Sequence, residues 1–261
     1  MTYVRLLRLF ARLSALNDLA YRANFVVQVF ESLLGLIAAL GGLALVYAHT
    51  ATLGGWRPAE LLAVLGVFFL MSGTINLVMQ PSMQRLMEDV WLGTLDFVLT
   101  KPEDAQLLVS VQEVQLWKLV DVALGLALLG VALLRLGAHL GFGQAGAFII
   151  AVLAGGAIVY SFLLVLATCS FWTIRAPNIL AIFQSMYEAG RWPISIYPPW
   201  LRATLTVVVP VGSAVTVPAG ALVGHQGWQG IVGAVALAGA LLVASRWFWT
   251  MGLRHYVGAS A

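Results

Sequence analysis

Long apolar stretches, separated by short polar ones, make up most of this chain. A helix needs about 20 apolar residues to cross a hydrocarbon core about 30 Å thick. The last of these stretches also begins and ends at tryptophans, which favour the membrane–water interface. The pattern predicts membrane-spanning helices at 25–47, 60–79, 116–136, 145–172 and 228–249.

The region from 176 to 224 does not follow this simple pattern. Its first half is apolar apart from Glu188 and Arg191, which lie one helical turn apart. Its second half consists of two apolar pieces interrupted by Pro210 and Gly212, and at about 11 residues each piece is too short to cross the bilayer. Hydropathy therefore leaves more than one topology open for this region.

Two arrangements fit it. One is a cytoplasmic helix at 178–190 followed by a kinked span at 201–223. The other is a short span at 178–197 followed by a re-entrant hairpin at 198–224 on the far side of the membrane. With the spans above, either arrangement gives six transmembrane helices and leaves both ends of the chain on the same side.

The N-terminal segment predicts a different kind of helix. Arg5, Arg8 and Arg12 recur at helical spacing and share one face, while leucines fill the opposite face. An amphipathic helix of this kind lies in the membrane interface, where its arginines reach anionic headgroups. We assign this interfacial helix to residues 3–24.

The longest polar stretch, residues 81–104, separates the second and third spans. It also holds Lys101, one of the chain's two lysines, and predicts a loop in water whose acids are solvated. Its acidic residues, five of the eleven in the chain, are Glu88, Asp89, Asp96, Glu103 and Asp104.

Composition decides the class of protein. Hydrophobic residues make up 61% of the chain and charged residues only 10%, too few charges to cover a soluble domain. We therefore expect an all-α integral membrane protein in a lipid bilayer. The net charge of +3 comes from scattered basic residues and not from a patch, so no nucleic-acid partner is expected.

The basic residues also predict the orientation. Cytoplasmic loops carry an excess of Lys and Arg. The N-terminal arm, the polar stretch, Arg175 and the C-terminal tail hold most of them, whereas the opposite loops hold little beyond Arg57 and Arg135. We predict a multi-pass protein of the cell (cytoplasmic) membrane with both termini in the cytoplasm.

The usual signatures of catalysis are missing from the sequence. It has no P-loop, CxxC, HExxH or GxSxG motif, and its four histidines lie in or near loops without a carboxylate cluster. We expect no catalytic, cofactor or metal site on this chain. Glu188 and Arg191 are the one ionisable pair in a membrane segment, so they mark either a gate on a substrate path or a structural pair between helices.

Two stretches resemble one family. GTLDFVLTKP, at 93–102, resembles the GTLExLLxxP pattern of ABC-2 type permeases, the membrane subunits of one class of ATP-driven exporters. Residues 197–224 resemble the family's PxWLxxxxxxxPLxxxxxALxG region, and are similar in particular to a subfamily only distantly like daunorubicin-type export permeases. Val209 and Val223 depart from the usual Asn and Arg. The matching positions are Pro199, Trp200, Leu201, Pro210, Ala221, Leu222 and Gly224.

The resemblance implies partners. The permease would dimerise with itself or with a sister permease, and each half would sit on a separate ABC ATPase subunit that binds ATP and Mg. Family structures place a re-entrant hairpin before the last span, which favours the fifth span at 178–197. The sequence names no substrate, although apolar spans suit an amphipathic or lipid-like cargo.

The resemblance also implies a site. A short cytoplasmic coupling helix between spans two and three would dock in a groove of the ATPase. Gly93 permits a sharp turn, Thr94 is a candidate N-cap, and Asp96 falls in the first turn. The residues assigned to ATPase coupling are Gly93, Thr94, Leu95, Asp96, Phe97, Val98, Leu99 and Pro102.

Three other functional hypotheses are alternatives to an exporter subunit. An ion-gradient-driven secondary transporter would need ionisable groups at mid-bilayer in several spans, and only Glu188 and Arg191 qualify. A membrane enzyme acting on lipid would need acid and base clusters that the sequence lacks. A non-transporting membrane scaffold would show no ATPase partner, which distinguishes it by experiment.

Overall fold

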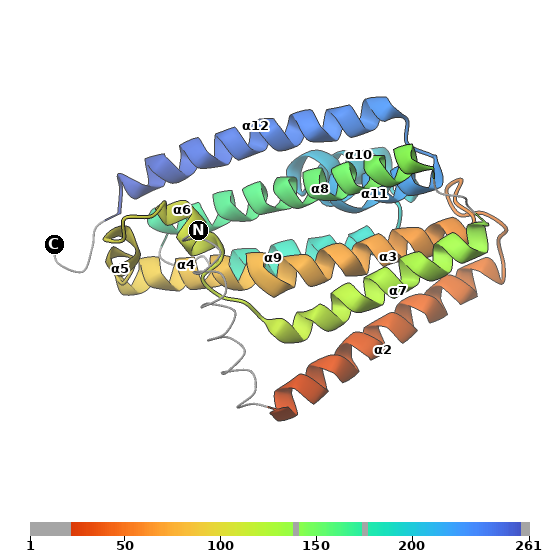
Figure 1. Ribbon diagram of the computed structural model, residues 1–261, viewed down its shortest axis with the longest axis horizontal. Coiled ribbons are helices and arrows are strands. Elements are labelled where there is room, and N and C mark those ends of the chain that lie inside the picture. Colours follow the sequence, from red (N-terminus) through yellow and green to blue (C-terminus); the bar gives the residue numbers. More distant parts are fainter. Residues whose placement is uncertain (1–21, 138–140, 174–176, 257–261) are drawn as a thin grey trace.

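The computed structural model describes residues 22–137, 141–173 and 177–256 (Figure 1). Helices dominate this part of the chain, and it contains no strand beyond one isolated bridge between Leu53 and Trp56. The long helices run roughly side by side along the longest axis of the molecule. They are α2 (Arg22–Tyr47), α3 (Pro58–Thr74), α4 (Gln80–Leu92), α7 (Leu119–Leu136), α8 (Phe142–Thr168) and α12 (Trp228–Leu253).

Five stretches of the described chain are helical, long and apolar enough to cross a membrane, or up to six if one bent pair of helices counts as a span. They are Phe25–Tyr47, Pro58–Leu92, Leu116–Leu136, Phe142–Phe171 and Trp228–Leu253. The prediction of an all-helical integral membrane protein is therefore confirmed.

The second of these helices continues well past Met79, where hydropathy ends the span. A π-helical turn, η1 (Ile75–Met79), joins α3 directly to α4, and the whole stretch is 35 residues long. Pro81 has no N–H for the carbonyl of Leu77 to accept, and the amide of Gln115 donates to that carbonyl instead, at 2.8 Å. The helix thus continues through a proline and carries the first half of the polar stretch as α4.

The region after α8 crosses the bundle as short helices. They are α9 (Pro177–Tyr187) and the 3₁₀ turns η4 (Glu188–Arg191) and η5 (Ile194–Ile196). α9 contacts α4 at one end of the bundle, and Ser195 donates to the carbonyl of Gly54, at 3.2 Å, in the α2–α3 loop at the other. The segment 177–196 therefore runs from one end of the bundle to the other.

The next segment leaves that far end and returns to it. α10 (Pro199–Ala203) and the π-helical η6 (Thr204–Val208) are bent by 94° from α11 (Val211–Val223). Directly after α11, Nε2 of His225 lies 3.5 Å from Glu60 at the start of α3. Both ends of this segment therefore lie near the α2–α3 loop.

α3 forms the centre of the bundle. Most of its span is buried, and it packs against α7, α11 and the turn η4. Glycines allow α3 and α7 to approach closely: a Cβ on Gly125 would lie 2.4 Å from the backbone nitrogen of Leu70, and one on Gly66 would lie 2.9 Å from that of Leu129. Small residues are the usual means of close packing between membrane helices, since lipid provides no hydrophobic force between them.

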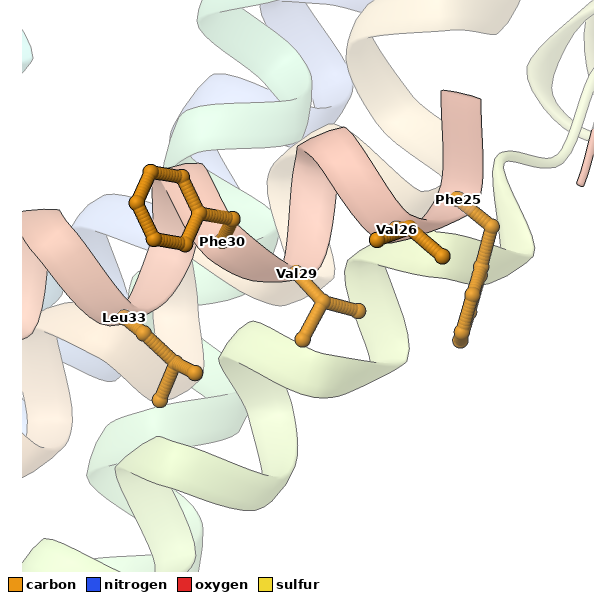
Figure 2. Close-up of a pocket in the computed structure, with 5 residues that line it drawn as sticks. All are labelled: Phe25, Val26, Val29, Phe30 and Leu33. Atoms are coloured by element: carbon orange, nitrogen blue, oxygen red, sulfur yellow. The ribbon is translucent and has the colours of Figure 1, made fainter. Parts of the chain in front are cut away.

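α2 contrasts with α3, because it is the least buried of the long helices. Figure 2 shows a shallow hollow on its surface, formed by apolar side chains of this one helix. Such a surface offers no hydrogen bond to a polar ligand and suits lipid or another apolar helix. The residues that line it are Phe25, Val26, Val29, Phe30 and Leu33.

We predict that alanine substitutions at two glycines of α7 have different effects on stability. Gly125→Ala should destabilise the protein by about 1–3 kcal/mol, because the added methyl group meets the backbone of α3. Gly130→Ala, where a Cβ has nothing within 4 Å, should be neutral or stabilising by up to about 1 kcal/mol. Apparent Tm values in detergent would check both, and equal Tm values for the two variants would contradict this account of the α3–α7 contact.

Candidate functional site

The polar stretch ends α4 in a tight reversal. Gly93 adopts a left-handed conformation with φ of 70°, and the amides of Thr94 and Leu95 both donate to the carbonyl of Asp89, at 2.9 and 3.3 Å. The hydroxyl of Thr94 donates to the Asp89 carboxylate, at 2.9 Å. Thr94 therefore holds the turn. The prediction that Thr94 caps the next helix is wrong, because Leu95 takes the N-cap position.

The helix after this turn, α5 (Asp96–Leu99), has an inner and an outer side. Leu95 and Val98 are buried against the rest of the protein, whereas the side chain of Phe97 is 75% exposed. The eight residues assigned to coupling are thus divided between those that anchor the turn and those that face outward.

Exposed apolar side chains gather at this end of the molecule. The end of α4 contributes Trp91, which is 69% exposed, and Leu92, and α5 contributes Phe97 and Leu99. We call these four residues the apolar patch. Trp91 and Leu92 are missing from the sequence-based site. Trp91 lies four residues after the buried Met87, so helical spacing alone would place it on the buried face, and only the structure shows it exposed.

Asp89 anchors the patch from within. It is only 2% exposed, so the expectation that the acids of this stretch are solvated is wrong for this residue. Its carboxylate accepts hydrogen bonds from Thr94 and from Nε2 of Gln112, at 2.8 Å, and Nε of Arg85 lies 3.3 Å away. A buried charge needs such partners, because leaving it unpaired would cost several kcal/mol.

A second polar network links the end of the polar stretch to two long helices. Asp104 caps α6 (Ala105–Ser110) by accepting from the amides of Gln106 and Leu107, at 2.9 and 3.3 Å. The Arg246 guanidinium of α12 donates twice to the same carboxylate, at 2.9 and 2.5 Å, and also to Oε1 of Gln106, at 2.8 Å. The hydrogen bonds from Arg246 hold the pKa of the Asp104 carboxyl below its usual value.

The same network reaches α8. Nε2 of Gln106 donates to the hydroxyl of Tyr160, at 3.1 Å, and that hydroxyl lies 2.7 Å from Oγ of Ser110. Side-chain hydrogen bonds therefore join α6, α8 and α12. A displacement of the polar stretch would therefore also displace α8 and α12.

Glu188 and Arg191 do form an ion pair, with 2.5 Å between Oε2 and Nη2. Both side chains are partly exposed, and the guanidinium of Arg191 lies 5.4 Å from the ring centre of Phe68. The spacing in the sequence thus identified a real pair, which lies where α9 gives way to η4.

The hairpin residues have structural positions. Pro199, Trp200 and Leu201 open α10, and the Trp200 side chain is exposed. Pro210 precedes the first turn of α11, and Gly224 ends that helix with φ of 82°. Within the ranges that the structure describes, no group of three or more His, Cys, Asp or Glu residues could hold a metal ion.

We predict that Asp104→Asn weakens the network but keeps the helix cap, since Asn caps helices about as well as Asp. The expected loss is about 0–1 kcal/mol at neutral pH, because the ion pair is partly solvated. Asp104→Ala should lose about 1 kcal/mol more, because it also removes the cap.

The same carboxyl gives this prediction a pH dependence. Because the pKa of Asp104 is lower in the folded protein, the ionised carboxylate stabilises the folded state at pH values above its ordinary pKa of 3.8. That stabilisation is lost as the pH falls from 3.8 through the lower pKa of the folded state. The difference in Tm between Asp104→Asn and the unmodified protein should therefore shrink in that acidic range. A difference that stays constant from pH 7 to pH 3 would contradict the ion pair.

Comparison with known protein families identifies the family of this chain. Residues 33–260 match the model of a family described as ABC-2 family transporter protein. Neither the curated proteins nor the solved structures gave a match. The resemblance identified at 93–102 and 197–224 is confirmed by a match that covers most of the chain. This multi-pass membrane protein belongs to the ABC-2 transporter family, whose members are transport subunits of ABC transporters.

Proposed function

We propose that this chain is the permease subunit of an ATP-driven exporter and that a separate ABC ATPase chain binds ATP and Mg. The apolar patch is the observation that carries the proposal. It lies at the end of the molecule assigned to the cytoplasm, where no other part of the described chain covers it, and an exposed cluster of this kind marks a protein contact. The outward residues, and not the buried Leu95 and Val98, would enter the groove of the ATPase.

The apolar patch is connected to the long helices of the bundle. α4 continues into α3 through η1, so movement of the patch acts directly on the central helix of the bundle. The Asp104–Arg246 ion pair gives a second path to α12. ATP binding by the partner would favour one arrangement of these helices, and hydrolysis would release it.

Two further elements belong to the same proposal. The segment 178–197 acts as a fifth span and 198–224 as a re-entrant hairpin on the outer side, with both termini in the cytoplasm. A second permease, identical or a sister chain, covers part of the exposed apolar surface of α2, and lipid covers the rest. The cargo is amphipathic or lipid-like.

We predict that the double variant Trp91→Asp, Phe97→Asp loses the ATPase. Aromatic anchors of an interface contribute about 2 kcal/mol or more each, so removing both should lower the affinity about a thousandfold if their contributions add. Copurification with a coexpressed cognate ABC ATPase would measure it. Phe97→Leu is the matched control, because it keeps an apolar side chain and should retain the ATPase.

Leu95→Asp is not a suitable variant for this test, because Leu95 is fully buried and a charge there would disrupt folding. A folded double variant that retains the ATPase at the level of the unmodified chain would refute docking through the apolar patch.

For the topology, we predict that a cysteine at Ala51 reacts with an impermeant thiol reagent from outside intact cells and that one at Thr100 reacts only after the membrane is opened. Both would be introduced into a Cys169→Ala background. Ala51 is exposed in the α2–α3 loop, whereas the neighbouring Gly54 is unsuitable because a Cβ there would lie 2.7 Å from Ile196. The reverse pattern of labelling would overturn the orientation.

A further inference from the structure

Two facing helices carry a line of polar side chains through the middle of the bundle. On α3 and η1, residues at positions i, i+4 and i+8 share one face, and on α9 and η4, residues at i, i+3 and i+7 share another. We call their contact the polar seam. Its members are Phe68, Ser72 and Asn76 on one side and Gln184, Tyr187 and Arg191 on the other.

Direct contacts join the two sides along the length of the seam. Nε2 of Gln184 donates to Oδ1 of Asn76, at 3.3 Å, and Asn76 donates to the carbonyl of Ser72, at 2.9 Å. Further along, the ring of Tyr187 stacks on that of Phe68, with 5.4 Å between ring centres. The Arg191 guanidinium covers the same Phe68 ring.

Several polar atoms of the seam are buried without a partner. Oε1 of Gln184, the hydroxyl of Tyr187 and Nε of Arg191 have no hydrogen-bond partner among the described residues. Tyr187 is only 4% exposed. Buried polar atoms are nearly always hydrogen-bonded, and each unpaired atom carries a free-energy penalty. Three unpaired atoms on one face of one segment therefore indicate that this face is closed in the present arrangement and contacts water in a second arrangement.

The backbone beside the seam is irregular in a way that suits movement. η1 places a π-helical turn at Asn76, and such turns occur frequently at functional sites. α9 gives way to the 3₁₀ turn η4 between Tyr187 and Arg191. Both sides can therefore rearrange without breaking a long regular helix.

The chemistry of the seam selects its occupant. Glu188 neutralises Arg191, so the surface carries no net charge. It offers an acceptor at Gln184, a hydroxyl at Tyr187, a donor at Arg191 and aromatic faces between them. This set matches a neutral group rich in hydroxyls and does not favour an anion or a cation.

We propose that the polar seam opens to water during transport and binds the neutral, hydroxyl-bearing part of an amphipathic cargo. The inference rests on the proposed function, since it supposes that the chain conducts a cargo. It places the route inside one protomer, between α3 and α9.

The test uses the full chain with its coexpressed ATPase in membrane vesicles, in the Cys169→Ala background. A cysteine at Gln184 should react with a charged, impermeant methanethiosulfonate at least about tenfold faster than one at Ile182, because a thiol needs water to ionise. Ile182 is the matched control, since it lies on the same helix and its side chain is 59% exposed on the outer, apolar surface. Ser72→Cys, a nearly isosteric change on the facing helix, gives the same readout if Gln184→Cys fails to fold.

Surfactants then identify the chemistry of the occupant. A short alkyl glucoside should protect the seam cysteine, whereas an alkyl sulfate and an alkyltrimethylammonium of equal chain length should not. Equal protection by all three would show that the apolar chain alone blocks access, and equal labelling at Gln184 and Ile182 would show that the seam stays closed; either result overturns the proposal.

A second variant tests the unpaired hydroxyl. Tyr187→Phe keeps the ring on Phe68 but removes the group that gains from water, so labelling at Gln184→Cys should become about tenfold slower with no loss of Tm. An unchanged labelling rate would overturn the proposal. ATPase copurification, measured on the Gln184→Cys protein with Tyr187 intact, separates the two claims. Absence of labelling with the ATPase still bound refutes the seam alone, and labelling without any bound ATPase refutes the proposed energy source alone.

Discussion

The close crossing of α3 and α7 is the contact on which the other elements of this protein depend. Lipid does not drive apolar helices together, so packing must do so, and Gly66 and Gly125 bring the two backbones into direct contact. That crossing places α3 at the centre of the bundle, where α11 and η4 can pack against it. An apolar helix on the periphery, such as α2, has no such constraint and stays largely exposed.

Because α3 lies at the centre of the bundle, its continuation into α4 connects that centre to the end of the molecule. Because η1 carries the helix past Pro81, one continuous element connects the membrane interior to the apolar patch. The amide of Gln115 satisfies the carbonyl that the proline leaves free, so this continuity costs no unpaired backbone group at that point. A partner that holds the patch therefore acts on the core of the bundle and not on a loose loop.

The buried polar groups fall into two kinds with different consequences. Asp89 and the Asp104–Arg246 pair are surrounded by hydrogen-bond partners, and such satisfied networks make the end of the bundle that carries the apolar patch rigid. Gln184 and Tyr187 keep unpaired atoms in the interior of the bundle, where each unmade hydrogen bond carries a penalty. A rigid end joined to a strained interior is a suitable construction for a protein that changes shape when its partner does.

Length, hydropathy and local motifs are read along the chain, so they were enough to predict the helical membrane class, the long spans and the family. They also marked the polar stretch at 81–104 as the candidate contact with a partner. The Glu188–Arg191 pair was also visible from its spacing. The packing of the helices was needed to show that Leu95 faces inward and Trp91 outward, that Asp89 is buried, and that 177–196 reaches the far end of the bundle. The reason is physical: residues that face lipid and residues that face protein are equally apolar, so hydropathy cannot tell which side of a membrane helix is packed.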